Sequence, residues 1–438
     1  MEKTKETMRP FQRANQSSRH TLSTGRLPVS SRCSRNGARG PFQLLVLLCL
    51  FSVSFAWQSG NVHLSKQVSR IPLTLHAETT QRKPHPRKRH NNYRDDGNRQ
   101  FNQTLVQSGS ADDLLDLIAS HNRCLAQPQA GGSLNSINFS TALHRLARHS
   151  SFASRESASV RASILSNPRF ALLLASIGEA LHGDTIPFGG REICNMAWAL
   201  AKLQIAPPLS VMPRADDNSR DALEQVSTQV RQAVLQVAVD RREGRSESDA
   251  TAWIPLLSQL AGHLVDYLQQ FAAIKVGKEQ FLQMQEMSNM MWASATANRA
   301  NDQVFATIAD RMMIQQRELL ENKPEEECLK PQEWSNTVWA IAKSGISMDA
   351  SVYVYIADLV THSEFFSQAF KPQEWSDLMW GTATSVSSMA RARNEVQQQD
   401  VDFPVLEKAA LDIMRAGCRF IISRQAEWFK TQELSNSA

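Results

Sequence analysis

The sequence lacks the motifs on which most enzyme and metal-binding classes depend. It has no GxxxxGK[S/T] phosphate loop, no GxGxxG turn, no HExxH or GxSxG motif and no EF-hand loop. Its six cysteines form no CxxC pair, and those beyond residue 100, namely Cys124, Cys194, Cys328 and Cys418, lie at least 70 residues apart. A disulfide framework or zinc site would cluster them. We therefore expect free, buried or half-buried thiols and a protein that is not an enzyme and holds no metal or cofactor.

The N-terminal apolar run is too short to span a bilayer. It extends over 13 residues from Leu44 to Ala56 and follows nine Lys and Arg in residues 1–40, whereas a membrane helix needs roughly 20 residues. Ser54 and Ala56 are the small residues that a signal peptidase needs before its cut. Residues 1–56 are thus predicted to be a signal peptide cleaved between Ala56 and Trp57, leaving no membrane anchor in the mature form. The alternative is an uncleaved N-terminal anchor.

Residues 57–109 are predicted to be an unstructured, transit-peptide-like segment. They are rich in Ser, Thr and basic residues, and the stretch 82–99 shows no apolar periodicity. A signal peptide, an aromatic residue at the cleavage point and a basic tail together resemble the bipartite presequences of algae with secondary plastids. That resemblance implies import into the plastid stroma, a reducing compartment in which unpaired cysteines are expected. A mitochondrial or secreted location is the alternative.

Charge is divided unevenly along the chain. The formal net charge is +5, but residues 1–100 hold 18 of the 48 Lys and Arg and only 5 of the 43 Asp and Glu. The remainder therefore carries 30 basic and 38 acidic residues and is mildly acidic. Bulk charge gives no support to nucleic-acid binding, so such a site has to be a local basic patch.

One sequence pattern recurs along the chain. The four clear copies are REICNMAWALAK (191–202), QEMSNMMWASAT (285–296), QEWSNTVWAIAK (332–343) and QEWSDLMWGTAT (373–384). A weaker copy, NFSTALHRLAR (138–148), has His144 at the Trp position, and a further copy begins at Gln432 and stops incomplete at Ala438. The Trp-equivalent residues are His144, Trp198, Trp292, Trp339 and Trp380, with steps of 54, 94, 47 and 41. The step of 94 is either two repeats, one of them degenerate, or one repeat with an insertion.

Each copy has the features of a helix with a wide apolar face. In the copy at 332–343, Pro331 precedes the motif at a first-turn position, Glu333 suits the positive end of the helix dipole, and Gly345 suits the C-terminal end. Such a face is typical of a helix packed between neighbours. We interpret the recurrent Trp as a structural core residue wedged between hairpins, in preference to an RNA-stacking role. Trp339→Ala should then cost about 3–5 kcal/mol.

A second apolar-periodic segment follows each motif. Examples start at Phe170, Val304, Val352 and Phe403. Two helices repeated at roughly 40–50 residues describe an α-solenoid, in which stacking of hairpins makes one continuous core. The predicted fold is an all-α solenoid over residues 110–438 with an incomplete last repeat.

The repeated segments resemble helical repeats of organellar RNA-binding proteins. The similar families are the octotricopeptide proteins of algal chloroplasts, the repeat proteins that often end in a RAP domain, and the helical-repeat domain of the RNA-editing substrate-binding complex. The resemblance covers about residues 110–438, although no RAP domain follows the repeats here. It implies binding of single-stranded organellar RNA in processing, stability or translation, together with other RNA-processing proteins.

Helical-repeat RNA-binding proteins contact bases through side chains at fixed repeat positions. Two polar positions seven residues apart recur in the motif and lie opposite the apolar arc. The pairs are Thr141/Arg148, Asn195/Lys202, Asn289/Thr296, Asn336/Lys343 and Asp377/Thr384. Asn can hydrogen-bond a base edge and Lys or Arg can contact a phosphate. Alternatively, these residues are simply solvated, or the Asn joins neighbouring hairpins.

Two other functions remain open. A protein-binding α-solenoid scaffold in an organellar complex is favoured by the acidic charge beyond residue 100. An RNA-cleaving enzyme would need a nuclease module beyond Ala438.

Overall fold

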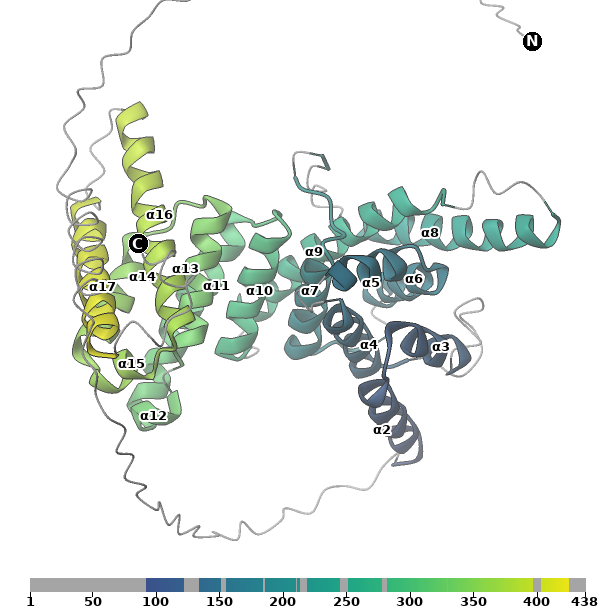
Figure 1. Ribbon diagram of the computed structural model, residues 1–438, viewed down its shortest axis with the longest axis horizontal. Helices are drawn as coiled ribbons and strands as arrows, with labels where there is room; N and C mark the ends of the chain where they lie inside the picture. Colours follow the sequence, from purple (N-terminus) through teal and green to yellow (C-terminus); the bar gives the residue numbers. More distant parts are fainter. Residues whose placement is uncertain are drawn as a thin grey trace, which may run out of the picture. The chain divides into compact units, whose positions relative to one another are not determined.

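The computed structural model describes residues 92–121, 134–150, 155–183, 186–209, 211–212, 219–244, 251–277, 282–328, 330–396 and 403–424. All regular secondary structure in these ranges is α-helical (Figure 1), which confirms the predicted all-α class. No helix within the described ranges is both long and apolar enough to cross a membrane. The predicted signal peptide, the Ala56/Trp57 cleavage site and the copy that begins at Gln432 lie outside the described residues.

The helices that carry the repeated motif pack one on the next. These first-row helices are α4 (Ser136–His149), α7 (Gly190–Leu203), α10 (Met284–Thr296), α13 (Pro331–Ser344) and α16 (Pro372–Val396). Each of them contacts the following member of the row, and α2 (Asn92–Gln107) packs on α4. All five copies within the described residues are therefore helical, as the sequence predicts.

The helices between the motifs form a second row of neighbours. They are α6 (Pro168–His182), α8 (Ser219–Arg242), α9 (Ile254–Gly277), α11 (Asp302–Asn322), α14 (Ala350–His362) and α17 (Phe403–Arg424). Each contacts the next in that order. The four apolar segments predicted after the motifs are α6, α11, α14 and α17, so this prediction is confirmed. Short helices complete the described part: α3 (Ala111–His121), α5 (Arg155–Leu165), α12 (Glu325–Cys328) and α15 (Glu364–Ala369).

The step of 94 residues between Trp198 and Trp292 is one repeat with an insertion. Helices α7 and α10 are in direct contact, and the described residues between them in the sequence add no further first-row helix. Both α8 and α9 belong to the second row, and α9 packs against α7 and α10. Trp253, which directly precedes α9, is buried in the core and only 2% exposed. The first row therefore keeps its regular stacking while the second row gains one helix.

Local interactions explain where the first-row helices begin and end. Pro331 lies in the first turn of α13, and Gly345 ends that helix with a φ of 68°, both as predicted. The recurrent Glu has a second role beyond the helix dipole. Glu286 accepts a hydrogen bond from the backbone N–H of Gln283 at 2.9 Å, and Glu374 accepts one from Lys371 at 2.8 Å. In α10 and α16 this carboxylate satisfies a backbone donor before the first turn.

The helical region begins earlier than the sequence suggests. Residues 92–107 form α2, whose Phe101 and Leu105 are buried, so the predicted unstructured state of residues 57–109 is wrong over residues 97–107. The Phe101 ring stacks on His121 of α3 with ring centroids 3.7 Å apart. Two apolar residues four apart are too few to produce a periodic signal, and tertiary packing on α4 stabilises the helix instead.

Candidate nucleic-acid interface

The Trp-equivalent residues of all five described repeats form one continuous row of rings. Ring centroids are 4.9 Å apart for His144 and Trp198, 6.5 Å for Trp198 and Trp292, 6.1 Å for Trp292 and Trp339, and 6.4 Å for Trp339 and Trp380. Interplanar angles lie between 23° and 36°. These distances fall in the range in which aromatic pairs attract. We call these five residues the aromatic ladder.

The ladder is only half-buried. Trp198, Trp292 and Trp339 pack against the core, and these three residues, His144 and Trp380 are each partly exposed. The expectation of a structural core residue therefore holds only in part. In α13 and α16 the indoles that fill the core are Trp334 and Trp375, both 0% exposed. They lie five residues before the ladder residue, and this spacing places them on a different face of the helix.

The ten predicted RNA-binding positions lie beside the ladder. Each first-row helix has one such position three residues before its ladder residue and the other four residues after it, and these spacings share a helix face. All ten are half-buried or exposed: Thr141, Arg148, Asn195, Lys202, Asn289, Thr296, Asn336, Lys343, Asp377 and Thr384. The predicted grouping of each pair on one face holds. The prediction that each pair lies opposite the apolar face of its helix is less accurate, because the half-exposed ladder residue lies between the two polar residues.

Lys202 joins two steps of the ladder. Its Nζ lies 5.7 Å from the ring centroid of Trp198 and 4.8 Å from that of Trp292. This geometry is a cation–π contact with both indoles. Partial burial lowers the pKa of Lys202 from its ordinary value. The ammonium therefore covers the joint between α7 and α10.

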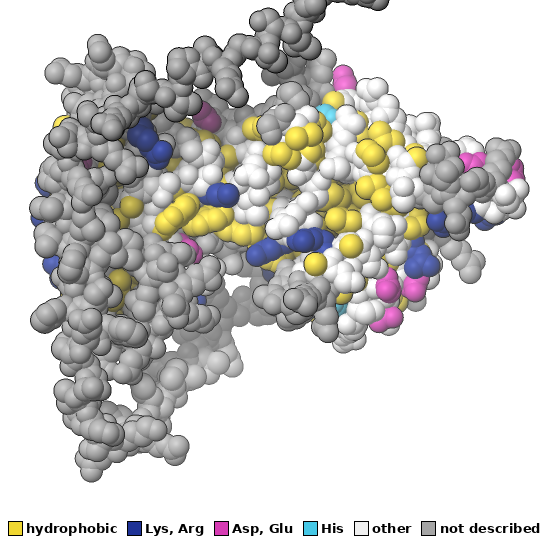
Figure 2. All heavy atoms as spheres, turned by 45° about the horizontal axis from the view of Figure 1, so that its top comes forward, with side chains coloured by type: hydrophobic (Ala, Val, Ile, Leu, Met, Phe, Trp, Pro, Cys, Tyr) yellow, Lys and Arg dark blue, Asp and Glu magenta, His cyan; other side chains and the backbone are white. Residues whose placement is uncertain are grey.

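The α4 end of the ladder is electropositive. Burial lowers the pKa of His144, and the charges of Arg148, Arg145 and Arg191 lower it further. Among the described residues Arg148, Arg191 and Lys202 form no ion pair. Figure 2 shows one face of the molecule on which Lys and Arg side chains lie among exposed hydrophobic side chains. The region beyond residue 100 is acidic overall, yet it carries a local group of basic side chains.

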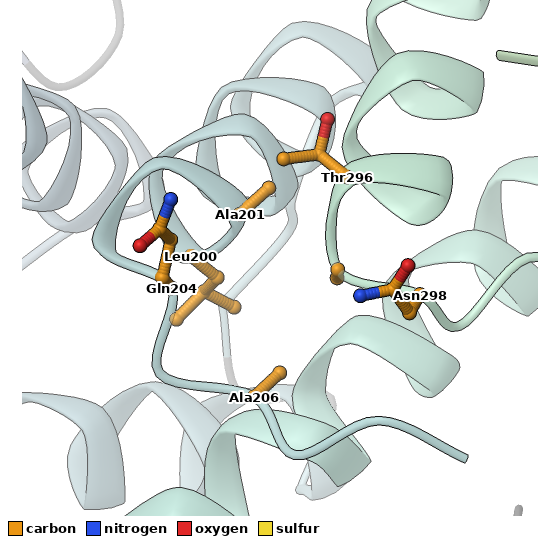
Figure 3. Close-up of a pocket in the computed structure, with 7 residues that line it drawn as sticks. Leu200, Ala201, Gln204, Ala206, Thr296 and Asn298 are labelled. Carbon is orange, nitrogen blue, oxygen red and sulfur yellow. The ribbon is translucent and has the colours of Figure 1, made fainter. Parts of the chain in front are cut away.

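A hollow of about 230 Å³ lies one helical turn from the ladder. It separates the C-terminal ends of α7 and α10 and is lined by Leu200, Ala201, Gln204, Ala206, Thr296 and Asn298, among others (Figure 3). Thr296 is one of the predicted RNA-binding residues. Gln204 and Asn298 were not predicted, because each lies just beyond a motif copy, where the pattern stops.

A buried ion pair holds the turns around this hollow. Arg299 and Asp266 of α9 are 0% and 1% exposed, and the guanidinium contacts both carboxylate oxygens. Arg299 also donates to the carbonyl oxygens of Pro207 at 2.9 Å and Met212 at 3.0 Å. The buried charges are therefore paired and hydrogen-bonded. The sequence pattern gave no sign of this pairing, since its partners lie 33 and more residues apart.

The described residues contain no group of three or more His, Cys, Asp or Glu arranged to hold a metal ion. Cys194 and Cys328 are buried free thiols, as predicted, and Cys418 is half-buried. Burial raises the pKa of Cys194 well above its ordinary value, which makes that thiol a poor nucleophile. Cys33, Cys49 and Cys124 lie outside the described residues.

No protein-family model matches the chain, and no curated protein matches it in sequence. The candidate interface is therefore defined by its own geometry: half-exposed rings in a row, polar side chains on both sides of them, and unpaired cations at one end. Aromatic side chains beside cations also occur in many proteins that bind single-stranded nucleic acids.

Proposed function

We propose that the protein binds single-stranded RNA along the aromatic ladder and supports RNA processing, stability or translation in an organelle, without catalysing a reaction. The half-exposed ladder is the single observation that carries this proposal. A base can stack on any aromatic face, and such stacking is worth about 1–3 kcal/mol per base. Lys202, Arg148 and Arg191 would supply the phosphate contacts that position the strand.

The two rows of helices support an α-solenoid architecture for this function. Helices of one row contact mainly their nearest neighbours, as in other repeat proteins. A surface built from successive repeats offers equivalent positions to successive nucleotides. The resemblance of the motif to octotricopeptide and RAP-associated repeats favours the same function.

RNA binding can be tested with labelled single-stranded oligonucleotides and the full chain over a range of salt concentrations. The variant Lys202→Glu/Lys343→Glu places two negative charges beside the ladder, and Lys408→Glu on the second-row helix α17 is the matched control. Each phosphate contact contributes about 0.7 to the slope of log affinity against log salt for a single strand. We expect the double variant to bind more weakly and with a slope smaller by about 1.4, whereas the control should match the unmodified protein.

Unchanged affinity and an unchanged salt slope in the double variant would remove this face as the binding surface. If the unmodified protein shows no salt-dependent RNA binding, the proposal fails. The protein-binding scaffold, which the net charge of −8 beyond residue 100 favours, then becomes the better assignment.

We also propose that the N-terminal segment delivers the protein to the plastid stroma. The support is the succession of a basic segment, a 13-residue apolar run, Trp57 and a basic tail. Residues 1–100 fused to a fluorescent reporter should accumulate in the stroma. Replacing Trp57 with Ala should divert the reporter from the plastid, and accumulation in mitochondria or outside the cell would contradict this targeting.

A further inference from the structure

Three arginines at the contact between α4 and α7 stand out from the repeated motif. Arg191 lies seven residues before its ladder residue, where the other three clear copies have Gln. Arg145 directly follows its ladder residue, where the four clear copies have Ala or Gly. Arg148 occupies the position held by Lys or Thr in those copies. This first-row contact therefore carries two cations that the repeat pattern does not require, in addition to one at the usual position.

The three guanidinium groups lie around one end of the aromatic ladder. Helices α4 and α7 are in direct contact, and the His144 ring lies 4.9 Å from that of Trp198. After burial, the charges of Arg148, Arg145 and Arg191 are what lower the pKa of His144, so each of them is within electrostatic reach of its ring. We call Arg145, Arg148 and Arg191 the arginine cluster.

No carboxylate among the described residues neutralises the arginine cluster. Neither Asp113 of α3 nor Glu192 of α7 forms an ion pair with any of its members. The Nε–H of Arg145 is buried and has no acceptor, while its Nη2 donates to a backbone carbonyl oxygen at 3.3 Å. Like charges that are close and partly buried destabilise a fold unless a counter-charge pairs with them. An anion at this place would remove that cost.

The cluster lies where stacking along the ladder stops. Helix α2 also packs on α4, but none of its described side chains places a ring against His144. The remainder of the ladder has no comparable group of cations. Among the predicted RNA-binding positions of α10, α13 and α16, Lys343 is the one basic residue and Asp377 is acidic. Positive charge is therefore concentrated at one end of the ladder.

We propose that the arginine cluster binds the terminal phosphate monoester of the RNA strand that lies along the ladder, with Arg148 and Arg191 as its direct ligands. The proposal rests on the RNA-binding function proposed above. A phosphodiester within the strand carries one negative charge, whereas a monoester, as in phosphoserine, carries about 1.5–2 at pH 7 and has three acceptor oxygens. Guanidinium groups match these oxygens with paired N–H donors. A strand end is also the part of the RNA that needs no further stacking partner.

The test is a competition assay with the full chain and three versions of one short single-stranded RNA. One version carries a 5′-phosphate, one a 3′-phosphate and one hydroxyl groups at both ends, and an internally labelled RNA serves as the tracer for fluorescence anisotropy. One phosphorylated version should bind roughly tenfold more tightly than the hydroxyl version, the effect of one further charge-assisted contact. Its log affinity should also fall more steeply with log salt, by about 0.7. The version that gains identifies the end that lies at α4.

A variant built from the other repeats separates the cluster from the rest of the ladder. Arg148→Thr/Arg191→Gln introduces the residues that other copies carry at these two positions, so the helices are retained, and circular dichroism checks this. The variant should bind all three RNAs with equal affinity. Lys343→Thr is the matched control, because it replaces a cation with Thr at the repeat position of Arg148. This control should weaken the three RNAs to the same extent and keep the preference for the phosphorylated end.

The proposal is overturned if the unmodified protein binds the three RNAs equally. It is also overturned if Arg148→Thr/Arg191→Gln keeps the preference, since the gain is then a general effect of added charge, or if Lys343→Thr removes it. RNA binding along the ladder would stand in each of these cases. If the unmodified protein binds none of the three RNAs, both proposals are overturned.

Discussion

Two tryptophans of α13 allow the structural and the binding roles of the repeat to be separated. Trp334 is completely buried, whereas Trp339, five residues later, is a half-exposed member of the aromatic ladder. Replacing each with alanine removes the same side chain from the same helix. We expect Trp334→Ala to lower mainly the free energy of unfolding and Trp339→Ala to lower mainly RNA affinity.

The magnitudes follow from the surroundings of the two rings. Truncating a buried Trp costs about 3–5 kcal/mol, and the lower end applies to Trp334 because its Nε1–H has no hydrogen-bond partner in the described structure. Trp339 contacts two rings, Trp292 and Trp380, and each aromatic pair contributes about 0.5–1.5 kcal/mol. The two ring pairs therefore account for about 1–3 kcal/mol of the stability loss for Trp339→Ala, and the packing of its partly exposed indole against the core adds less than the complete burial of Trp334 does. Loss of a stacked base costs a further 1–3 kcal/mol of binding, roughly 5- to 150-fold in affinity.

Urea unfolding followed by far-UV circular dichroism measures the first effect, and fluorescence anisotropy with labelled single-stranded RNA measures the second. Affinity is compared under conditions where both variants remain folded. Equal losses of affinity in the two variants would refute the assignment of the ladder as a binding surface. A larger stability loss for Trp339→Ala than for Trp334→Ala would refute the division between core and ladder.

Two further predictions concern buried charges. Burial raises the pKa of Glu333 to about 7. Between pH 4.5 and 7 the folded protein therefore keeps a proton on this carboxyl group that the unfolded chain has already released. The free energy of unfolding should fall by about 3 kcal/mol over that pH range. Glu333→Gln should remove this fall, and denaturation midpoints measured across that range check it; an unchanged profile would show that the carboxyl is not buried. Asp266→Ala leaves the buried Arg299 unpaired and should cost about 3–5 kcal/mol. Adding Arg299→Met should recover part of that loss, as measured by urea unfolding, and no recovery would argue against an unpaired charge as the cause.

The repeated motif was sufficient to predict the first row of helices. Its apolar spacing, Pro331 and Gly345 are local signals that act within one or two turns, and α13 ends where they indicate. The same local character explains what was missed. The motif could not decide between a degenerate repeat and an insertion after Trp198, because α8 and α9 are placed by contacts with helices distant in sequence.

The candidate interface was predicted less completely than the fold. The motif identified the ladder residues and the polar positions around them, since both recur at fixed spacing. The motif led us to predict buried rings, because apolar periodicity does not distinguish the core face of a helix from the half-exposed edge of that face. Gln204, Asn298 and the Asp266–Arg299 pair occur once each, so no repeat marked them.

The contact between successive indoles has a spectroscopic consequence. Rings separated by 6.1–6.5 Å are close enough for an excited indole to pass its energy to the next one before it emits. Light absorbed at any of the four tryptophans is therefore shared among them, and a quencher placed against a single ring dims the emission of its neighbours as well. Tryptophan fluorescence can therefore report the binding of a ligand to the aromatic ladder.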